Sequence, residues 1–321
     1  MKVTLGIDIG GTNTVFGFVE EKSTHCRWTD QIETASYKTA QQLFKAIFEQ
    51  VKEALHNRDD LNLVGIGVGA PNGNYYTGSV EKAPNLPWQN ANIVQIVNSF
   101  FDLPVAITND ANAAAIAEMK FGAAKGMRDF IEITLGTGLG SGIVVNGKMV
   151  YGSDGFAGEL GHTIVHEDGR LCNCGRKGCL ETYVSANGLK RTLMELIASE
   201  NMNSPLTQIP YEKITARQIY EEAKGGDRLA LEVFEVTGKI LGIALANAAA
   251  CLSPEAIILY GGLVAAGDLL LQPTRKYFEK NLLNIFQGKV KIIASALDLN
   301  EAAILGAGAL IWTEINNGKT E

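Results

Sequence analysis

Two stretches of this chain repeat one plan, in which a β-rich run meets a cluster of glycines and a second β-rich run follows. They are residues 3–19, VTLGIDIGGTNTVFGFV, and residues 131–145, IEITLGTGLGSGIVV. Each stretch predicts a β-hairpin with a glycine turn. Neither is a Walker loop, because no Gly-Lys-Ser/Thr follows, and neither is a dinucleotide fingerprint, because a strand rather than a helix comes next. Two such hairpins in one chain predict two related domains that face each other across a cleft.

Glycine turns of this kind are suited to binding phosphate groups. Glycine permits backbone angles closed to other residues and lets amide N–H groups approach a bulky anion. Asp8, just before the first turn, would be tolerated beside a phosphate only if a cation such as Mg²⁺ lay between them. For the first motif alone, an ordinary glycine turn with a solvated aspartate is the alternative. The residues expected at a phosphate are Asp8, Gly10, Gly11, Thr12, Asn13, Gly136, Thr137 and Gly138.

The pair of hairpins is more specific than either one. It indicates the α/β, two-domain ATPase fold shared by actin and the hexokinases, built from duplicated ribonuclease H-like domains with a cleft between them. In that fold, opposed hairpins hold the phosphates of ATP.

A third stretch, residues 158–181, carries three cysteines and a histidine upstream of them. Three thiolates and one imidazole complete a tetrahedral zinc shell, and a closed shell of four ligands indicates a structural metal. A disulfide would leave an odd thiol and need an oxidising compartment, and an iron–sulfur cluster usually requires a fourth cysteine. We favour zinc over both alternatives. The candidate ligands are His162, Cys172, Cys174 and Cys179.

Two glutamates in the same stretch, Glu159 and Glu181, are not needed by this metal shell. A loop held still by a metal is a good support for carboxylates that bind a polar ligand such as a sugar.

Asn109 and Asp110 stand between a predicted strand over residues 105–108 and an alanine-rich helix expected from Asn112. They would therefore lie at the carboxyl end of a strand beside a helix start, which is the usual site position in open α/β sheets. The alternative is that one of them only caps the helix. A cap needs one polar residue, whereas Asn-Asp-Ala-Asn supplies three, and this favours a functional role.

The rest of the chain reads as alternating helices and strands. The spacing of apolar residues predicts a helix over 41–55, a buried strand over 63–69, and helices over 186–200 and over 215–250, the last with a break at 225–227. Residues 72–90 are polar and turn-rich, with Asn85 and Trp88 as their notable members. Cys251 is expected to be an inert core thiol. A strand is expected over 290–297 and a final helix over 301–315.

The stretch AIILYGG at 256–262 repeats the step from strand to glycine. Gly261 and Gly262 would let the chain pass close to a flat ligand such as adenine. A plain turn at a helix start is the alternative.

Charge and hydropathy limit the partners. The net charge of −7 argues against a nucleic-acid partner and against an anionic membrane surface. No apolar run reaches the length of about 18 residues that spans a bilayer, and Asp8 interrupts the apolar N-terminus that a secretory signal would need. We expect a cytoplasmic protein.

Taken together, the motifs resemble the ROK family of sugar kinases and sugar-responsive repressors over nearly the whole chain. The matching segments are DIGGTN at 8–13, NDANAAA at 109–115, LGTGLGSG at 135–142, GELGH at 158–162, CNCGRKGCLE at 172–181 and YGG at 260–262. The repressors carry a DNA-binding helix-turn-helix before the first hairpin, whereas only seven residues precede Asp8 here. We therefore expect a kinase. One departure is GAPNGNYY at 69–76, where a plainer glycine-proline turn is expected.

The resemblance implies a role for each site residue. Asp110 would be the general base, and the sugar hydroxyls would be bound by Asn85, Asn109, Asp110, Glu159, His162 and Glu181. His162, Cys172, Cys174 and Cys179 would hold structural Zn²⁺, and ATP with Mg²⁺ would be the phosphoryl donor, with Gly261 and Gly262 beside the adenine.

These roles predict ATP-dependent phosphorylation of a hexose at its 6-hydroxyl, with glucose as the expected substrate. N-acetylmannosamine, N-acetylglucosamine, mannose, allose and fructose remain alternative substrates, and a non-catalytic sugar sensor is the alternative function. The expected domains are residues 1–116 plus 300–321 and residues 117–299. The resemblance also implies a homodimer.

Overall fold

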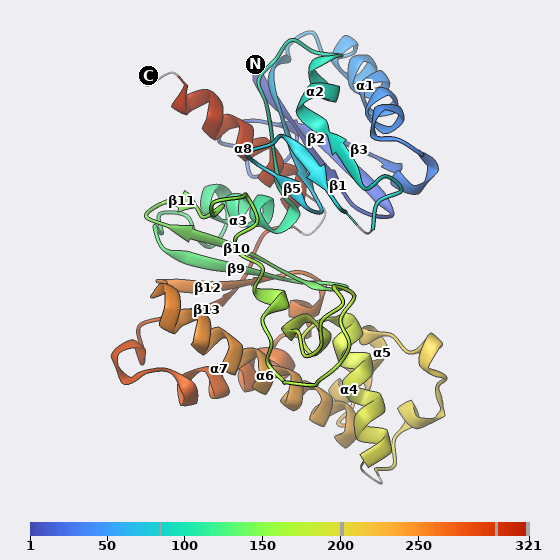
Figure 1. Ribbon diagram of the computed structural model, residues 1–321, viewed down its shortest axis with the longest axis vertical. Helices are drawn as coiled ribbons and strands as arrows, with labels where there is room; N and C mark the ends of the chain where they lie inside the picture. Colours follow the sequence, from blue (N-terminus) through green and yellow to red (C-terminus); the bar gives the residue numbers. More distant parts are fainter. Residues whose placement is uncertain (84, 200–201, 299–300, 319–321) are drawn as a thin grey trace.

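The computed structural model describes residues 1–83, 85–199, 202–298 and 301–318, and it has two lobes stacked along the long axis of the molecule (Figure 1). Each lobe is built on a five-stranded sheet. The first sheet contains β1 (Lys2–Ile9), β2 (Asn13–Val19), β3 (Trp28–Glu33), β4 (Asn62–Ala70) and β8 (Val105–Asn109). The second contains β9 (Phe130–Leu135), β10 (Leu139–Val145), β11 (Lys148–Met149), β12 (Ala256–Tyr260) and β13 (Lys291–Ala294).

The two sheets have the same topology. Their strand orders are β3-β2-β1-β4-β8 and β11-β10-β9-β12-β13. In each sheet, the central strand pairs antiparallel with the next strand along the chain and parallel with its other neighbour, so that β1 corresponds to β9 and β4 to β12. This repeat confirms the predicted α/β fold with duplicated domains.

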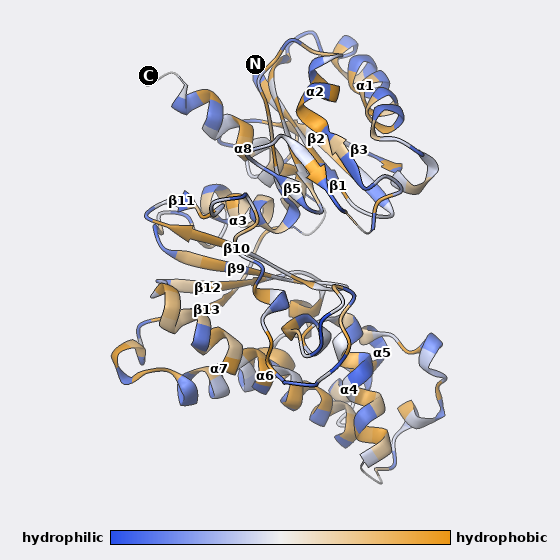
Figure 2. Ribbon diagram, viewed as in Figure 1, coloured by the Kyte–Doolittle hydropathy of each residue, from blue (hydrophilic) through white to orange (hydrophobic). Residues whose placement is uncertain are grey.

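Helices cover both faces of each sheet (Figure 1). The α-helices are α1 (Ala40–His56), α2 (Ile93–Asn98), α3 (Asp110–Phe121), α4 (Ala186–Ser199), α5 (Ala216–Lys224), α6 (Arg228–Leu252), α7 (Asp268–Asn281) and α8 (Ala302–Asn317). The 3₁₀ helices are η1 (Thr34–Ser36), η2 (Leu160–His162), η3 (Leu180–Thr182), η4 (Pro205–Gln208), η5 (Tyr211–Lys213), η6 (Gly262–Ala266) and η7 (Asn284–Phe286). Apolar residues concentrate on the strands and on the helix faces that cover them (Figure 2).

Each lobe has its own hydrophobic core. In the first, the side chains of β1 and β4 pack against α1 and α2. In the second, one face of β9 and β12 packs against α4, α6 and α7. Helix α1 forms as its pattern predicts, because Thr39 caps it by accepting a hydrogen bond from the N–H of Gln42, and Leu43, Ile47 and Val51 are buried on one face.

Two helices rich in small residues lie between the sheets. Helix α8 packs on β1 and β4, helix α3 packs on β10, and the two helices contact each other. A Cβ atom at Gly306 of α8 would collide with the carbonyl oxygen of Ala113 in α3, so glycine is required at this crossing. The small residues of the two helices thus allow close packing. Through this contact, α3 and α8 connect the two lobes.

Some local expectations differ from the structure. Cys251 is exposed near the end of α6, so its assignment as a core thiol is wrong. Helix α3 begins at Asp110 rather than at Asn112. The turn-rich segment 72–90 and the two residues after it also contain a three-stranded sheet of β5 (Gly73–Asn74), β6 (Ser79–Glu81) and β7 (Asn90–Asn92).

The predicted domain division stays a prediction. Its boundary at residue 116 falls inside α3. Residues 300 and 319–321, which were assigned to the first domain, lie outside the described residues. Among the helices that the structure describes, none combines the length and the apolar composition needed to cross a bilayer.

Candidate active site and metal centre

The first glycine turn joins β1 to β2. The paired strands leave residues 10–13 as the turn, and the N–H of Gly10 donates to the carbonyl oxygen of Asn13 at 3.0 Å. A Cβ atom at Gly11 would lie 2.8 Å from the carbonyl oxygen of Asn85. Neither glycine has a positive φ. The expectation that this turn needs backbone angles reserved for glycine is therefore wrong, because glycine is required here by close contacts.

The second glycine turn spans residues 136–138 between β9 and β10 and resembles the first. The N–H of Gly136 donates to the carbonyl oxygen of Gly138 at 3.0 Å. A Cβ atom at Gly136 would meet nothing within 4 Å, whereas one at Gly138 would lie 2.9 Å from Oε2 of Glu181. Helix α4 supports this turn, because the N–H of Ala186 donates to the carbonyl oxygen of Gly136 at 2.9 Å. Neither Gly136 nor Gly138 has a positive φ. A close contact requires glycine at 138 but not at 136.

A cavity of about 560 Å³ opens beside the second turn. Its walls include Thr137 of the turn, Tyr220 of α5 and Leu263 of η6. Gly261 has a φ of +105°, and its missing Cβ would lie 2.5 Å from the carbonyl oxygen of Leu135. By contrast, a Cβ atom at Gly262 would meet nothing within 4 Å. A largely apolar cavity that ends at a glycine turn could hold the adenosine part of a nucleotide.

Asp8 lies near the end of β1, Asp110 directly follows β8, and these two strands flank β4. Asp8 pairs with Gly69, and Gly69 pairs with Thr108 on the other side. A Cβ atom at Gly69 would lie 3.2 Å from Oδ1 of Asp8 and 3.9 Å from Cα of Asp110, so the two acids are near neighbours. Burial and the charge of Asp110 raise the pKa of Asp8 to about 7. Burial also raises the pKa of Asp110, although its side chain keeps one side open to solvent.

Asn109 is the N-cap of α3. Its Oδ1 accepts a hydrogen bond from the N–H of Ala111 at 2.8 Å, and Oδ1 of Asp110 accepts from the same N–H at 2.9 Å. The capping alternative is therefore realised for Asn109. Asp110 is the first residue of α3, and its carboxylate has a second oxygen besides Oδ1.

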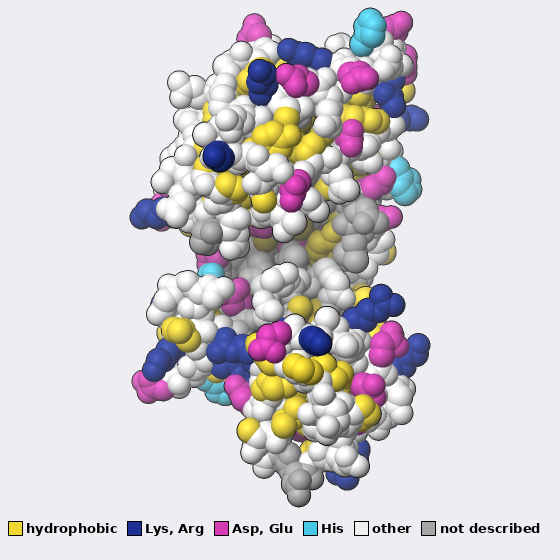
Figure 3. Space-filling view, turned by 90° about the vertical axis from the view of Figure 1, so that its right-hand side faces the viewer, with side chains coloured by type: hydrophobic (Ala, Val, Ile, Leu, Met, Phe, Trp, Pro, Cys, Tyr) yellow, Lys and Arg dark blue, Asp and Glu magenta, His cyan; other side chains and the backbone are white. Residues whose placement is uncertain are grey.

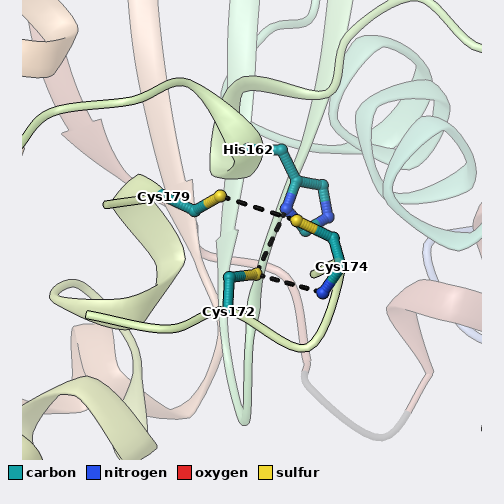
Figure 4. Close-up of side chains that lie close together, drawn as sticks. All are labelled: His162, Cys172, Cys174 and Cys179. Atoms are coloured by element: carbon teal, nitrogen blue, oxygen red, sulfur yellow. Dashed lines mark hydrogen bonds between the residues drawn. The ribbon is translucent and has the colours of Figure 1, made fainter. Parts of the chain in front are cut away.

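The side chains of His162, Cys172, Cys174 and Cys179 point toward one another (Figure 4). Their ligand atoms all lie within 4.8 Å of one another. The Sγ atoms of Cys174 and Cys179 are 3.6 Å apart, and Sγ of Cys172 is 3.7 Å from Nδ1 of His162. Gly175 and Gly178 both have positive φ, as a tight metal-binding knuckle requires. The donor set and its compactness fit a tetrahedral zinc ion.

The two glutamates adjoin this cluster on either side of His162. Oε2 of Glu159 lies 3.9 Å from Nε2 of the imidazole, and Oε1 of Glu181 lies 3.6 Å from Nδ1. Burial raises the pKa of Glu159, His162 opposes that shift, and the charges of Asp110 and Glu181 add to it. Asp110 and Glu181 therefore both lie within electrostatic reach of Glu159. Between the lobes the surface is hollowed (Figure 3).

Asn85 is exposed on the loop beside the first turn, which its carbonyl oxygen approaches. Trp88, by contrast, is buried in the core of the first lobe. A second cavity, of about 610 Å³, lies along β8 and α8 and includes none of the predicted site residues.

Sequence reasoning missed several buried charges near the site. Glu118 and Glu132 are fully buried, and burial raises the pKa of both carboxyls. The burial of Glu132 could have been predicted from the sequence, because it shares a strand face with Phe130 and Thr134 in an otherwise apolar run. Arg170, also buried, had no such signal.

Comparisons with known proteins agree with this geometry. The sequence model of the ROK family matches residues 4–314. A glucokinase from Halalkalibacterium halodurans is 36% identical over 98% of this chain and 96% of its own length. A crystal structure of a ROK family glucokinase from Streptomyces griseus, in complex with glucose and AMPPNP, is 34% identical, covers 96% of this chain and 98% of that one, and has a TM-score of 0.78. A ROK family transcriptional regulator, a homolog of the E. coli MLC protein, is 25% identical, covers 99% of this chain and 79% of that one, and has a TM-score of 0.86.

Proposed function

The chain belongs to the ROK family, and from this premise we propose that it transfers the γ-phosphoryl group of ATP to the 6-hydroxyl of glucose. One observation carries the proposal: Asp110 lies beside Asp8 and within electrostatic reach of Glu159. A potential base, a potential metal-binding acid and a potential sugar ligand are thus neighbours. The glucose- and AMPPNP-bound relative supports this substrate and this donor.

Asp110 is the proposed general base. A sugar hydroxyl is a poor nucleophile until its proton has an acceptor, and Asp110 takes that proton as the hydroxyl attacks the γ-phosphorus. The raised pKa of Asp110 brings its basicity closer to neutral pH, which favours proton transfer.

The phosphates are proposed to lie between the two turns. Backbone amides and side chains of residues 10–13 and 136–138 stabilise charge on the phosphoryl oxygens. Mg²⁺, when bound, neutralises part of that charge, and Asp8 is the carboxylate that would hold it through water. Gly261 and Gly262 let the chain pass beside the adenine.

Asn85, Asn109, Glu159, His162 and Glu181 are proposed to bind the sugar hydroxyls. The zinc ligands would be His162, Cys172, Cys174 and Cys179. Zinc, when bound, holds the loop that carries Glu159 and Glu181 in one conformation. His162 contributes on both sides, because its Nδ1 faces the thiols and its Nε2 faces Glu159.

Another hexose is the alternative substrate, and a sugar sensor without catalysis is the alternative function, since the regulator shares the fold. A sensor has no need of Asp8, Asp110 and two phosphate turns, and their presence favours the kinase. The homodimer and the cytoplasmic location remain predictions, the first testable by light scattering on the purified protein.

The deciding experiment is ATP-dependent ADP release with glucose, mannose, fructose, allose, N-acetylglucosamine or N-acetylmannosamine, against a control without sugar. We expect glucose to give the highest kcat/KM. A clear preference for another sugar would correct the substrate, and no release with any sugar from folded, zinc-loaded protein would favour the sensor.

A further inference from the structure

Arg170 is a buried cation whose guanidinium is hydrogen-bonded on every side. The residue is 8% exposed. Its Nε and Nη2 donate to the two carboxylate oxygens of Glu195 in α4, at 2.7 and 2.6 Å. Its Nη1 donates to the carbonyl oxygens of Thr182 at 2.7 Å and Gly188 at 3.2 Å, and Nη2 also reaches Oγ1 of Thr192 at 2.9 Å. Burying a guanidinium is costly, so a full set of partners is what allows it.

The backbone of Arg170 is fixed to the metal loop. Its N–H donates to the hydroxyl of Tyr183 at 3.0 Å, and the guanidinium lies 4.3 Å from the centre of that ring. Its carbonyl oxygen accepts from the N–H of Gly178 at 2.8 Å, next to the ligand Cys179. Arg170 therefore cannot shift without moving the knuckle that carries the proposed zinc ligands.

One partner of the Arg170 guanidinium lies next to a proposed sugar-binding residue. Thr182, whose carbonyl accepts from the guanidinium, directly follows Glu181 in η3. The segment is also tied down by Ser185, whose hydroxyl donates to the carbonyl oxygen of Glu181 at 2.7 Å. Arg170 thus fixes the backbone on which the Glu181 carboxylate stands.

Another partner, Gly188, lies in the helix end that contacts the second glycine turn. Gly188 belongs to the first turn of α4, as do Ala186 and Asn187. Ala186 donates its N–H to the carbonyl oxygen of Gly136, and Nδ2 of Asn187 donates to the carbonyl oxygen of Thr137 at 3.3 Å. The helix end that Arg170 bonds is therefore the same one that supports the second phosphate turn.

We propose that Arg170 is a positioning residue that couples the sugar-binding loop to the nucleotide-binding turn, so that each ligand strengthens the binding of the other. The proposal rests on the proposed function, because it assigns the two sites to glucose and ATP. A single rigid, planar group with five donors reaches η3 and α4 at once. A lysine ammonium, a single point with three donors, cannot satisfy the same five acceptors.

The test is equilibrium binding by calorimetry, in which the Kd of glucose is measured with and without AMPPNP and Mg²⁺. For the wild type we expect AMPPNP to tighten glucose binding by about 5- to 20-fold, in the usual range for coupled sites. In Arg170→Lys we expect that factor to fall to about 2 or less, with both ligands binding more weakly. Zinc content and far-ultraviolet circular dichroism are measured on every variant, so that loss of metal or fold is seen directly.

Two further variants sharpen the result. Glu195→Gln leaves Arg170 its charge and its bonds to Thr182, Gly188 and Thr192, and we expect it to lose part of the coupling. Arg58→Lys is the matched control, since Nη1 of Arg58 donates to the carbonyl oxygen of Ala54 in α1, far in sequence from both the metal loop and α4. We expect wild-type coupling from it.

Unchanged coupling in folded, zinc-loaded Arg170→Lys would overturn the proposal, as would a wild type in which AMPPNP leaves the Kd of glucose unaltered. If Arg170→Lys does not fold, Glu195→Gln decides, and full coupling in that variant rejects the role. Failure of the proposed function looks different, because the wild type would then fail to phosphorylate glucose whatever its coupling.

Discussion

The Nδ1 atom of His162 lies 3.7 Å from Sγ of Cys172, so that this imidazole faces the thiol cluster with one nitrogen while its Nε2 faces Glu159 at 3.9 Å. A metal on Nδ1 leaves a hydrogen on Nε2, which can donate to a carboxylate or a sugar hydroxyl. One side chain therefore connects the metal centre with the sugar site.

Removing one thiolate should show what zinc contributes to sugar binding. We expect Cys174→Ala to lose most of its zinc and to raise the KM for glucose by about tenfold, because the loop that carries Glu159 and Glu181 is no longer held. Metal analysis and steady-state kinetics measure the two effects. Cys251→Ala is the matched control, since this exposed thiol lies outside the cluster and should change neither value. Normal glucose affinity in zinc-free Cys174→Ala would reject the scaffold role.

We expect ionised Asp8 to lower the free energy of unfolding while it serves the reaction. Its pKa rises from 3.8 to about 7 on folding, because of burial and the charge of Asp110. The folded protein therefore holds a proton that the unfolded chain releases, and stability falls as pH rises from about 4 to about 7. Asp8→Asn removes this penalty, and we expect it to raise the free energy of unfolding by about 1–3 kcal/mol at pH 8, and by less at pH 5.

Urea denaturation at both pH values tests the Asp8 prediction. The same variant should lose most of its turnover, since it lacks the proposed Mg²⁺ carboxylate. An Asp8→Asn protein less stable than the wild type at pH 8 would show that ionised Asp8 stabilises the fold.

Asn74 joins the two lobes. This buried side chain donates from Nδ2 to the carbonyl oxygen of Asp154 at 2.7 Å and accepts at Oδ1 from the N–H groups of Tyr76 and Thr77. Asn74→Ala should cost about 1–3 kcal/mol, because buried polar groups lose their partners. It should also raise the KM for glucose, since the chain leading to Glu159 loses its tie to the first lobe.

The matched control for Asn74 is Asn281→Ala, whose side chain bonds only to the carbonyl oxygen of Tyr277 in its own helix and is exposed. Thermal unfolding of both variants measures the difference. Equal melting temperatures for the two would contradict the assigned bond.

Gly261 and Gly262 provide a neighbouring pair with opposite expectations. Alanine at 261 meets a positive φ and the carbonyl oxygen of Leu135, and should destabilise the protein by about 1–3 kcal/mol. Alanine at 262 has free space and should leave stability unchanged, but it should raise the KM for ATP because its methyl group enters the proposed adenine site. Denaturation and ATP kinetics on both variants test this, and an unaltered KM for ATP in Gly262→Ala would remove Gly262 from the nucleotide site.

The duplicated fold was predictable because each hairpin has a local signature of alternating apolar residues around a glycine turn. The approach of Asp8 to Asp110 was predictable too, since one lies near the end of β1, the other directly follows β8, and both strands run parallel to β4. The exposure of Cys251 was missed, because the stripe of buried residues in α6, which includes Leu241, Leu245 and Ala249, does not extend to it. Nor were the partners of Asn74 and Arg170 predictable. Asp154 lies 80 residues from Asn74, and the partners of Arg170 lie 12 to 25 residues beyond it, so both sets of bonds form only in the folded chain.

The most direct test of the account is product formation by the wild type and by Asp110→Asn, with glucose, ATP and Mg²⁺, followed by ³¹P NMR, alongside calorimetry of glucose binding. We expect the wild type to make glucose 6-phosphate. We expect Asp110→Asn to be slower by about 10²- to 10⁴-fold, as for the loss of a general base, while it binds glucose with nearly unchanged affinity. Retention of most of the wild-type rate by Asp110→Asn would contradict the assignment of Asp110 as the base.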